Sequence, residues 1–257
     1  MKPEALLLDL DGTIYQGTSL IPGAADTLLF LQNAGIPYRF ITNTTRMSKS
    51  NLVLMLADMG LRVFPSEIFA PPHAASIYCQ KRGYNNIMLV VKDKEIEEDF
   101  YKFQLVDNNP DAIVLGDVGK GFTFALLNNL FNHILNGSEL VALHKNRFWQ
   151  SSTGYTVDVG PFVSALEYAS GKPAAIMGKP NANIFILASL DWGLPGEKIL
   201  MVGDDIDGDI GGALGVGMQS VLVKTGKFMN ISLQNSDKQP DHIINSIADL
   251  PKFLELY

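Results

Sequence analysis

Three features of the sequence predict an α/β fold built on parallel sheets. Over roughly the first 70 residues, short apolar runs alternate with amphipathic stretches of helical length. The alternation returns beyond residue 198, and a third alternating region lies between these two. Strands that alternate with helices form parallel sheets covered on both faces, so we expect a doubly wound core and a second α/β unit. With 257 residues and 47% hydrophobic content, the chain can form one large domain or two modest ones.

The amino-terminal elements are delimited by proline, serine and glycine. Pro22 suits the first turn of a helix, and Gly35 suits the position just past its end. Ser48 is a candidate cap for a second helix, which Gly60 would end. The expected elements are a buried strand at 5–9, a helix at 22–34, a strand at 37–42 and a helix at 48–60. Next, Pro71-Pro72 can begin either a last helix of this region or a linker.

The rest of the chain repeats the alternation of strands and helices. In the middle we expect strands at 87–91, 112–115 and 140–143, and helices at 122–135 and 162–169. Towards the far end we expect strands at 198–202, 219–223 and 242–244, and helices near 207–214 and 247–256. The polar stretch 230–240 has little periodicity and predicts a surface loop.

A pair of carboxylates follows the first strand, in the segment Asp9-Leu10-Asp11-Gly12-Thr13. Successive strand side chains point to opposite faces, so we expect Asp9 and Asp11 to fall on the same side where the strand ends. Two such carboxylates can share one Mg²⁺ and divide nucleophilic and acid/base work on a phosphate ester. The alternative is that Asp-Gly only supplies a turn after a buried strand.

Three further segments supply the other groups that phosphoryl transfer needs, which are phosphate donors, a cation and metal ligands. They are Ile41-Thr42-Asn43, Gly178-Lys179-Pro180, and Gly203-Asp204-Asp205 with Asp209. Each segment alone is typical of a loop, a surface turn or a solvated acidic loop. Together, and in this order, the four segments resemble the motifs of the haloacid dehalogenase superfamily of phosphatases.

This resemblance implies a Rossmann-like core at 1–76 and 174–257, with a large α/β cap of the C2 type inserted at 77–173. The stretch from His144-Lys145-Asn146-Arg147 to Ala169 is similar to a narrower group of the superfamily. That group contains haloacid dehalogenase-like hydrolase domain-containing protein 2 and the phospholysine phosphohistidine inorganic pyrophosphate phosphatase.

The resemblance also implies a role for each motif residue. Asp9 would be the nucleophile, Asp11 the general acid and base, and Lys179 the catalytic cation that also binds substrate. The Mg²⁺ ligands would be the Asp9 carboxylate, the Asp11 carbonyl and the Asp204 carboxylate, with Asp205 or Asp209 in support. Phosphate would be held by Gly12, Thr42, Asn43 and Lys179.

A cluster in the middle region is a candidate for selecting the leaving group. His144, Lys145, Arg147 and Trp149 lie close together in sequence, and an extended chain would put the last three on one face. The alternative is an edge strand with ordinary exposed charges.

Composition excludes several other classes of protein. A net charge of −7 and the lack of a basic stripe argue against a nucleic-acid binder. No apolar run approaches the roughly 20 residues that span a bilayer, and no signal-peptide pattern is visible. We therefore expect a cytoplasmic protein that does not bind membranes. The single cysteine, Cys79, is expected to serve packing. A calcium EF-hand starting at Asp205 is disfavoured, because Ile210 and Val216 occupy the positions of its glycine and glutamate.

The sequence therefore predicts a Mg²⁺-dependent phosphatase of small phosphorylated metabolites that acts through an aspartyl-phosphate. Two alternatives stay open. One is hydrolysis of phosphohistidine, phospholysine or inorganic pyrophosphate, and the other is a non-catalytic protein that binds a phosphate ligand. The resemblance also suggests a homodimer formed through the cap.

Overall fold

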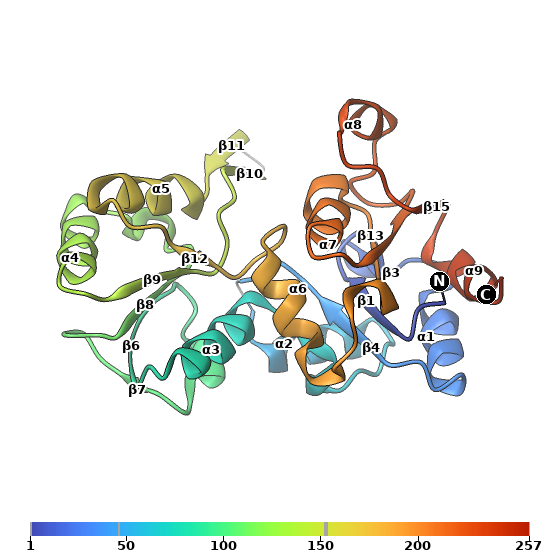
Figure 1. Cartoon of the computed structure of the whole chain (residues 1–257), viewed down its shortest axis with the longest axis horizontal. Helices are drawn as coiled ribbons and strands as arrows, with labels where there is room; N and C mark the ends of the chain where they lie inside the picture. Colours follow the sequence, from blue (N-terminus) through green and yellow to red (C-terminus); the bar gives the residue numbers. More distant parts are fainter. Residues whose placement is uncertain (1, 46, 152–153, 257) are drawn as a thin grey trace. The chain divides into compact units, whose positions relative to one another are not determined.

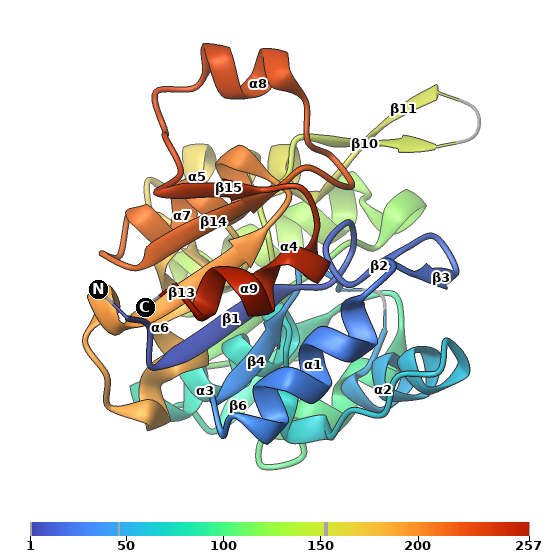
Figure 2. The same cartoon turned by 90° about the vertical axis from the view of Figure 1, so that its right-hand side faces the viewer.

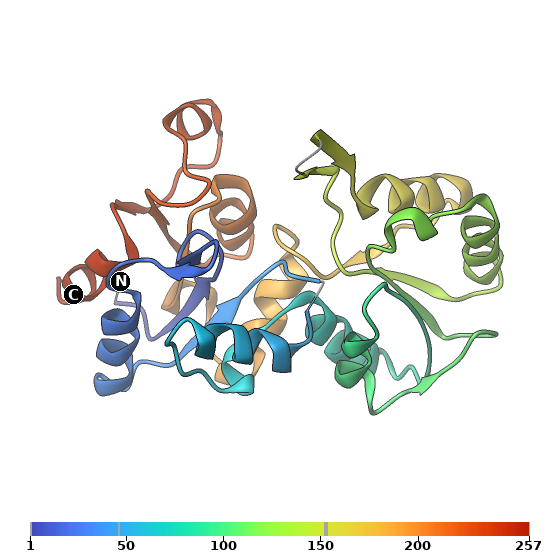
Figure 3. The same ribbon diagram turned by 180° about the vertical axis from the view of Figure 1, so that it is seen from behind.

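The computed structural model describes residues 2–45, 47–151 and 154–256, and these form two compact units. The first unit comprises Met1–Thr42, Ser50–Phe69 and Lys179–Tyr257, and the second comprises Asn43–Lys49 and Ala70–Gly178. Each unit is a parallel sheet with helices packed on it, so the predicted α/β fold is confirmed. Both chain ends lie in the first unit (Figures 1 and 3). The expected cap boundaries at 77 and 173 stay a prediction.

The first unit is built on a six-stranded parallel sheet (Figure 2). Its strands, in spatial order, are β15 (His242–Ile244), β14 (Gln219–Val223), β13 (Ile199–Gly203), β1 (Ala5–Asp9), β4 (Tyr38–Ile41) and β5 (Ile68–Phe69). The chain runs outwards from β1 through β4 to β5, and then returns to the other side of β1 as β13. In open α/β sheets, ligands bind at the carboxyl ends of the strands where the strand order reverses in this way. The fold therefore directs attention to the carboxyl ends of β1 and β13.

Helices cover both faces of this sheet. On one face α1 (Ala24–Asn33) contacts α9 (Leu250–Leu254), and on the other α6 (Ala182–Ser189) contacts α7 (Gly212–Leu214) (Figure 2). Every residue of β1 is buried, as expected for a central strand covered on both sides. The chain also forms the hairpin β2 (Tyr15–Gln16) and β3 (Ser19–Leu20), and α2 (Lys49–Asp58), which begins directly after Ser48.

Two segments of the first unit differ from the prediction. The helix expected near 207–214 is instead a π-helical turn, Ile206–Gly211, that runs into α7. The loop expected at 230–240 contains a short helix, α8 (Asn230–Asn235). Two apolar residues flank or lie in this helix, Phe228 and Leu233, and both pack against a buried cluster that includes Ile206. Local packing therefore orders a segment in which helical periodicity is weak.

The second unit is built on a five-stranded parallel sheet. Its strands, in spatial order, are β12 (Ala175–Ile176), β9 (Glu139–Ala142), β8 (Ala112–Leu115), β6 (Asn86–Val90) and β7 (Gln104–Leu105). Two helices, α4 (Phe124–Leu135) and α5 (Val159–Ser170), pack on one face of this sheet and contact each other. A third helix, α3 (Pro71–Arg82), completes the unit (Figure 1). Pro71 therefore begins a helix that belongs to the second unit.

Local features explain details of this unit that periodicity did not predict. Helix α5 begins at Val159 because the Asp158 side chain accepts a hydrogen bond of 2.8 Å from the Val159 N–H. An antiparallel hairpin, β10 (Phe148–Ser151) with β11 (Gly154–Val157), precedes this helix. Cys79 is buried in α3, as expected for a packing residue. None of the helices in the described ranges is long and apolar enough to cross a membrane.

Candidate active site

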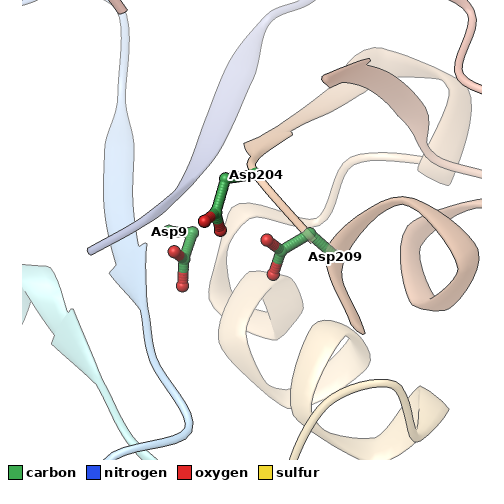
Figure 4. Close-up of side chains that lie close together, drawn as sticks. All are labelled: Asp9, Asp204 and Asp209. Atoms are coloured by element: carbon green, nitrogen blue, oxygen red, sulfur yellow. The ribbon is translucent and has the colours of Figure 1, made fainter. Parts of the chain in front are cut away.

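Three aspartates converge at the carboxyl end of the first unit's sheet (Figure 4). Asp9 is the last residue of β1, Asp204 follows β13 directly, and Asp209 lies in the π-helical turn beyond it. One carboxylate oxygen from each lies within 4.8 Å of the others. All three are buried, with exposed fractions of 5%, 2% and 1% respectively. Three buried carboxylates can lie this close together only if cations balance their negative charge.

Lys179 supplies one of these cations. Its Nζ donates hydrogen bonds to Asp9 Oδ1 and, over 2.6 Å, to Asp209 Oδ1. It also donates to the carbonyl of Ile41, the last residue of β4, at 3.3 Å. Because one ammonium cannot neutralise three carboxylates, the group keeps a negative charge that favours a divalent cation.

Burial sets the protonation of this group in the absence of metal. It raises the pKa of Asp9 to about 8, even though Lys179 acts in the opposite direction. Burial likewise raises the pKa of Asp204 to about 6. For Lys179, burial opposes the charged form, but Asp209 and Asp9 together hold its pKa above the ordinary value. Lys179 is therefore a permanent cation, whereas the carboxylates gain from a further positive charge.

The surroundings of Asp204 fit a hard cation such as Mg²⁺. Asp204 Oδ2 accepts a hydrogen bond of 2.6 Å from the main-chain N–H of Lys227. Its Oδ1 is buried and has no hydrogen-bond partner among the described residues. A buried carboxylate oxygen without a donor is costly, and Mg²⁺ prefers oxygen ligands of this kind. Asp9, Asp204 and Asp209 are therefore the side chains that fit the metal.

The Asp205 side chain caps a turn, whereas the Asp209 side chain belongs to the buried trio. Asp205 Oδ1 accepts hydrogen bonds from the main-chain N–H groups of Asp207, at 3.1 Å, and Gly208, at 2.8 Å. It thereby caps the start of the π-helical turn. The Asp205 main-chain N–H also donates to Asp209 Oδ2 over 3.1 Å, which orients the Asp209 carboxylate. Of the two residues considered from sequence, Asp209 is the one in the buried trio.

The other motif residues differ from one another in burial and in hydrogen bonding. Strand β1 ends at Asp9, so strand alternation does not extend to Asp11, which is exposed. The Gly12 N–H donates to the Tyr15 carbonyl at 2.7 Å, and a Cβ at Gly12 would lie 2.0 Å from Asp204 Oδ2. Thr42 is buried directly after β4. Asn43 is grouped with the second unit, and its role stays a prediction.

The candidate leaving-group residues are engaged within the second unit. Lys145 forms an ion pair with Glu167 of α5. Arg147 lies over the Phe148 ring, with its guanidinium carbon 5.8 Å from the ring centre. The side chain of Trp149 lies outside the described part of the chain. The roles of Lys145 and Arg147 in binding substrate stay predictions.

The segment Thr225-Gly226-Lys227 contacts Asp204 and Gly12, although it belongs to none of the four motifs recognised in the sequence. A signal was present, because these residues follow the strand β14 just as the recognised motifs follow β1, β4 and β13. Polar and glycine residues at the carboxyl ends of parallel strands are candidates for a site regardless of motif.

Comparison with known proteins identifies the family of this chain. A family model described as haloacid dehalogenase-like hydrolase matches residues 6–105, and one described as HAD-hydrolase-like matches 176–250. Human haloacid dehalogenase-like hydrolase domain-containing protein 2 is 37% identical over 225 residues, which is 88% of this chain and 85% of that protein. The phospholysine phosphohistidine inorganic pyrophosphate phosphatase of Bos taurus is 33% identical over 250 residues, or 95% of this chain and 91% of that protein.

Solved structures have the same fold as this chain over nearly its whole length. A 4-nitrophenylphosphatase from Thermotoga maritima superposes with a TM-score of 0.87 at 29% identity, covering 98% of this chain and 97% of that one. NagD from Escherichia coli K-12 has the same fold, with a TM-score of 0.86 at 22% identity over 97% of this chain and 98% of its own. The chain therefore belongs to the haloacid dehalogenase-like hydrolase family and is one of its phosphatases.

Proposed function

We propose that the protein is a Mg²⁺-dependent phosphatase that hydrolyses phosphate monoesters of small metabolites through an aspartyl-phosphate on Asp9. The observation that carries this proposal is the buried trio of Asp9, Asp204 and Asp209 with Lys179 hydrogen-bonded to two of its members. The trio supplies a nucleophile and oxygen ligands, and Lys179 supplies a fixed positive charge where negative charge gathers.

In the first half of the reaction, an Asp9 carboxylate oxygen attacks phosphorus in line with the leaving group. The new Asp9 O–P bond forms as the bond from phosphorus to the leaving oxygen breaks. Lys179 orients the Asp9 carboxylate and stabilises charge on the attacking and phosphoryl oxygens. Mg²⁺, held by Asp9, Asp204 and Asp209, would supply further charge stabilisation for the phosphoryl group.

Asp11 is proposed to move the protons. Its carboxyl group would protonate the leaving oxygen in the first step and then remove a proton from the incoming water. That water attacks phosphorus, breaks the Asp9 O–P bond and releases inorganic phosphate with the Asp9 carboxylate restored. An exposed Asp11, two residues beyond Asp9, suits a group that exchanges protons with solvent and substrate. Gly12, Thr42 and Asn43 are proposed to surround the phosphate.

A second candidate reaction is hydrolysis of phosphorus–nitrogen or pyrophosphate bonds. The observation that favours it is the 33% identity to the bovine phospholysine phosphohistidine inorganic pyrophosphate phosphatase over 95% of this chain. The same nucleophile and cations would serve, because only the leaving group differs. The proposed cap at 77–173, with Lys145 and Arg147, would set the choice between leaving groups.

Substitution of Asp9 tests the nucleophile. We expect Asp9→Asn to lower the turnover of p-nitrophenyl phosphate by roughly a thousandfold or more, because an amide cannot form the phosphoenzyme. Asp26→Asn is a matched control, since Asp26 is an exposed aspartate in the first turn of α1. Equal activity of Asp9→Asn and wild type would contradict the proposal.

A panel of sugar phosphates, pyrophosphate and imidodiphosphate, assayed with and without Mg²⁺, separates the two candidate reactions. A preference for imidodiphosphate would favour the second candidate.

The pH dependence of Mg²⁺ binding tests the ligand set. Because the pKa of Asp9 is raised to about 8 and that of Asp204 to about 6, protons compete with the cation at lower pH. Raising the pH removes these protons, so Mg²⁺ affinity should increase, by at least about tenfold between pH 6 and pH 8. Isothermal titration calorimetry in two buffers of different ionisation enthalpy measures both the affinity and the protons released. A constant affinity without proton release would contradict the assignment of these ligands.

We also propose that two copies associate through the second unit. This unit exposes large apolar or aromatic side chains, among them Phe124, Tyr155 and Tyr168, with exposed fractions of 85%, 76% and 92%. Burial of these side chains against a second copy would favour association. Light scattering at micromolar concentration should give the mass of a dimer, and the mass of a monomer would exclude it.

A cytoplasmic location, without nucleic-acid or membrane partners, stays a prediction.

A further inference from the structure

We propose that Thr225 is a positioning residue for Asp204, acting through a hydrogen bond that joins the loop after β14 to the loop after β1. This bond would hold Gly226 and the Lys227 N–H against one oxygen of the Asp204 carboxylate and leave the other oxygen for the cation. The inference rests on the proposed function, because it assigns a metal-positioning role within that same site.

Two glycines lie against one oxygen of the Asp204 carboxylate. A Cβ added to Gly12 would lie 2.0 Å from Asp204 Oδ2, and a Cβ added to Gly226 would also lie 2.0 Å from it. Both glycines have positive φ, at +92° and +57°, which other residues rarely adopt. The two loops therefore approach the carboxylate more closely than any side chain would allow.

The two oxygens of this carboxylate have different surroundings. Oδ2 lies against both glycines and accepts a hydrogen bond of 2.6 Å from the Lys227 main-chain N–H. Oδ1 is buried without a hydrogen-bond partner among the described residues. Because Oδ2 is fixed, the plane of the carboxylate is fixed, and Oδ1 is held ready as a metal ligand. Ligands oriented by a second layer of hydrogen bonds bind metal more tightly.

Thr225 sets the spacing of the two glycine loops. Its Oγ1 donates to the Gly12 carbonyl over 2.5 Å, although the two residues are 213 positions apart in sequence. Strand β13, which carries Asp204 at its end, lies between β1 and β14, so this bond crosses over Asp204's strand. Without it, the loops can separate, the Lys227 N–H can withdraw and the carboxylate can rotate.

The Lys227 side chain does not explain the arrangement. Its Nζ lies 3.3 Å from Asp205 Oδ2, and its side chain is 67% exposed. An ion pair so open to solvent contributes little to orientation. The main chain of Thr225-Gly226-Lys227, fixed by the Thr225 hydroxyl, therefore orients the Asp204 carboxylate.

Titration of MgCl₂ into purified wild type and two Thr225 variants by calorimetry tests the proposal. Thr225→Val keeps the shape of threonine but removes the donor, and we expect the Kd for Mg²⁺ to rise by about tenfold. Thr225→Ser keeps the donor and should restore the Kd to within about threefold of wild type. Thermal unfolding without metal checks the folding of each variant. A purely structural role would change this unfolding temperature but not the Kd.

A pair of glycine variants gives an independent test. Gly226→Ala places a Cβ against Asp204, whereas Gly217→Ala adds one where no atom lies within 4 Å. Both glycines have positive φ, +57° and +74°, so both substitutions carry similar backbone strain. We expect only Gly226→Ala to weaken Mg²⁺ binding, again by about tenfold or more.

The outcomes separate this inference from the proposed function. If wild type binds Mg²⁺ and hydrolyses p-nitrophenyl phosphate, but Thr225→Val binds Mg²⁺ as well as wild type does, the positioning role is wrong and the function stands. If Thr225→Val does not fold, equal Mg²⁺ affinities of the two glycine variants would overturn the role instead. A wild type that neither binds Mg²⁺ nor hydrolyses the ester would contradict both.

Discussion

The site depends on the burial of three carboxylates around one ammonium group. Asp9, Asp204 and Asp209 would repel one another in a dry environment, and Lys179 offsets only part of that repulsion. The excess negative charge raises the cost of the metal-free state and favours a divalent cation. Lys179, which is hydrogen-bonded to Asp9, supplies positive charge where negative charge moves onto phosphate during attack. Metal binding and nucleophilic attack thus follow from one electrostatic arrangement.

The topology of the sheet is what allows this arrangement. The strand order reverses at β1, so segments distant in sequence end side by side at one edge. Asp9 ends β1, Asp204 follows β13, and the Lys179 ammonium reaches the carbonyl at the end of β4. Strands β1 and β13 are buried along their whole length, so these groups lie against the close-packed core of the first unit.

Much of this was predictable from the sequence, for a physical reason. Buried parallel strands are short apolar runs, and the polar residues that follow them meet at one edge of the sheet, which brings Asp9 and Asp204 together. Lys179 follows β12 of the second unit's sheet, so only the resemblance to the family's motifs predicted its place beside them. The choice between Asp205 and Asp209 could not be made, because it depends on a π-helical turn whose hydrogen bonds point one carboxylate inwards and use the other as a cap. The exposure of Asp11 follows from β1 ending at Asp9, which alternation alone does not reveal. The bond from Thr225 to Gly12 joins loops 213 residues apart and has no local signature.

The proposed mechanism requires that Asp9 becomes covalently phosphorylated during turnover. The most direct measurement is to quench the enzyme with acid during hydrolysis of p-nitrophenyl phosphate, reduce it with borohydride and locate the modified residue by peptide mass spectrometry. Borohydride converts an aspartyl-phosphate to homoserine, so we expect homoserine at position 9 only when substrate was present. Sustained turnover with an unmodified Asp9, or with the modification on another residue, would contradict it.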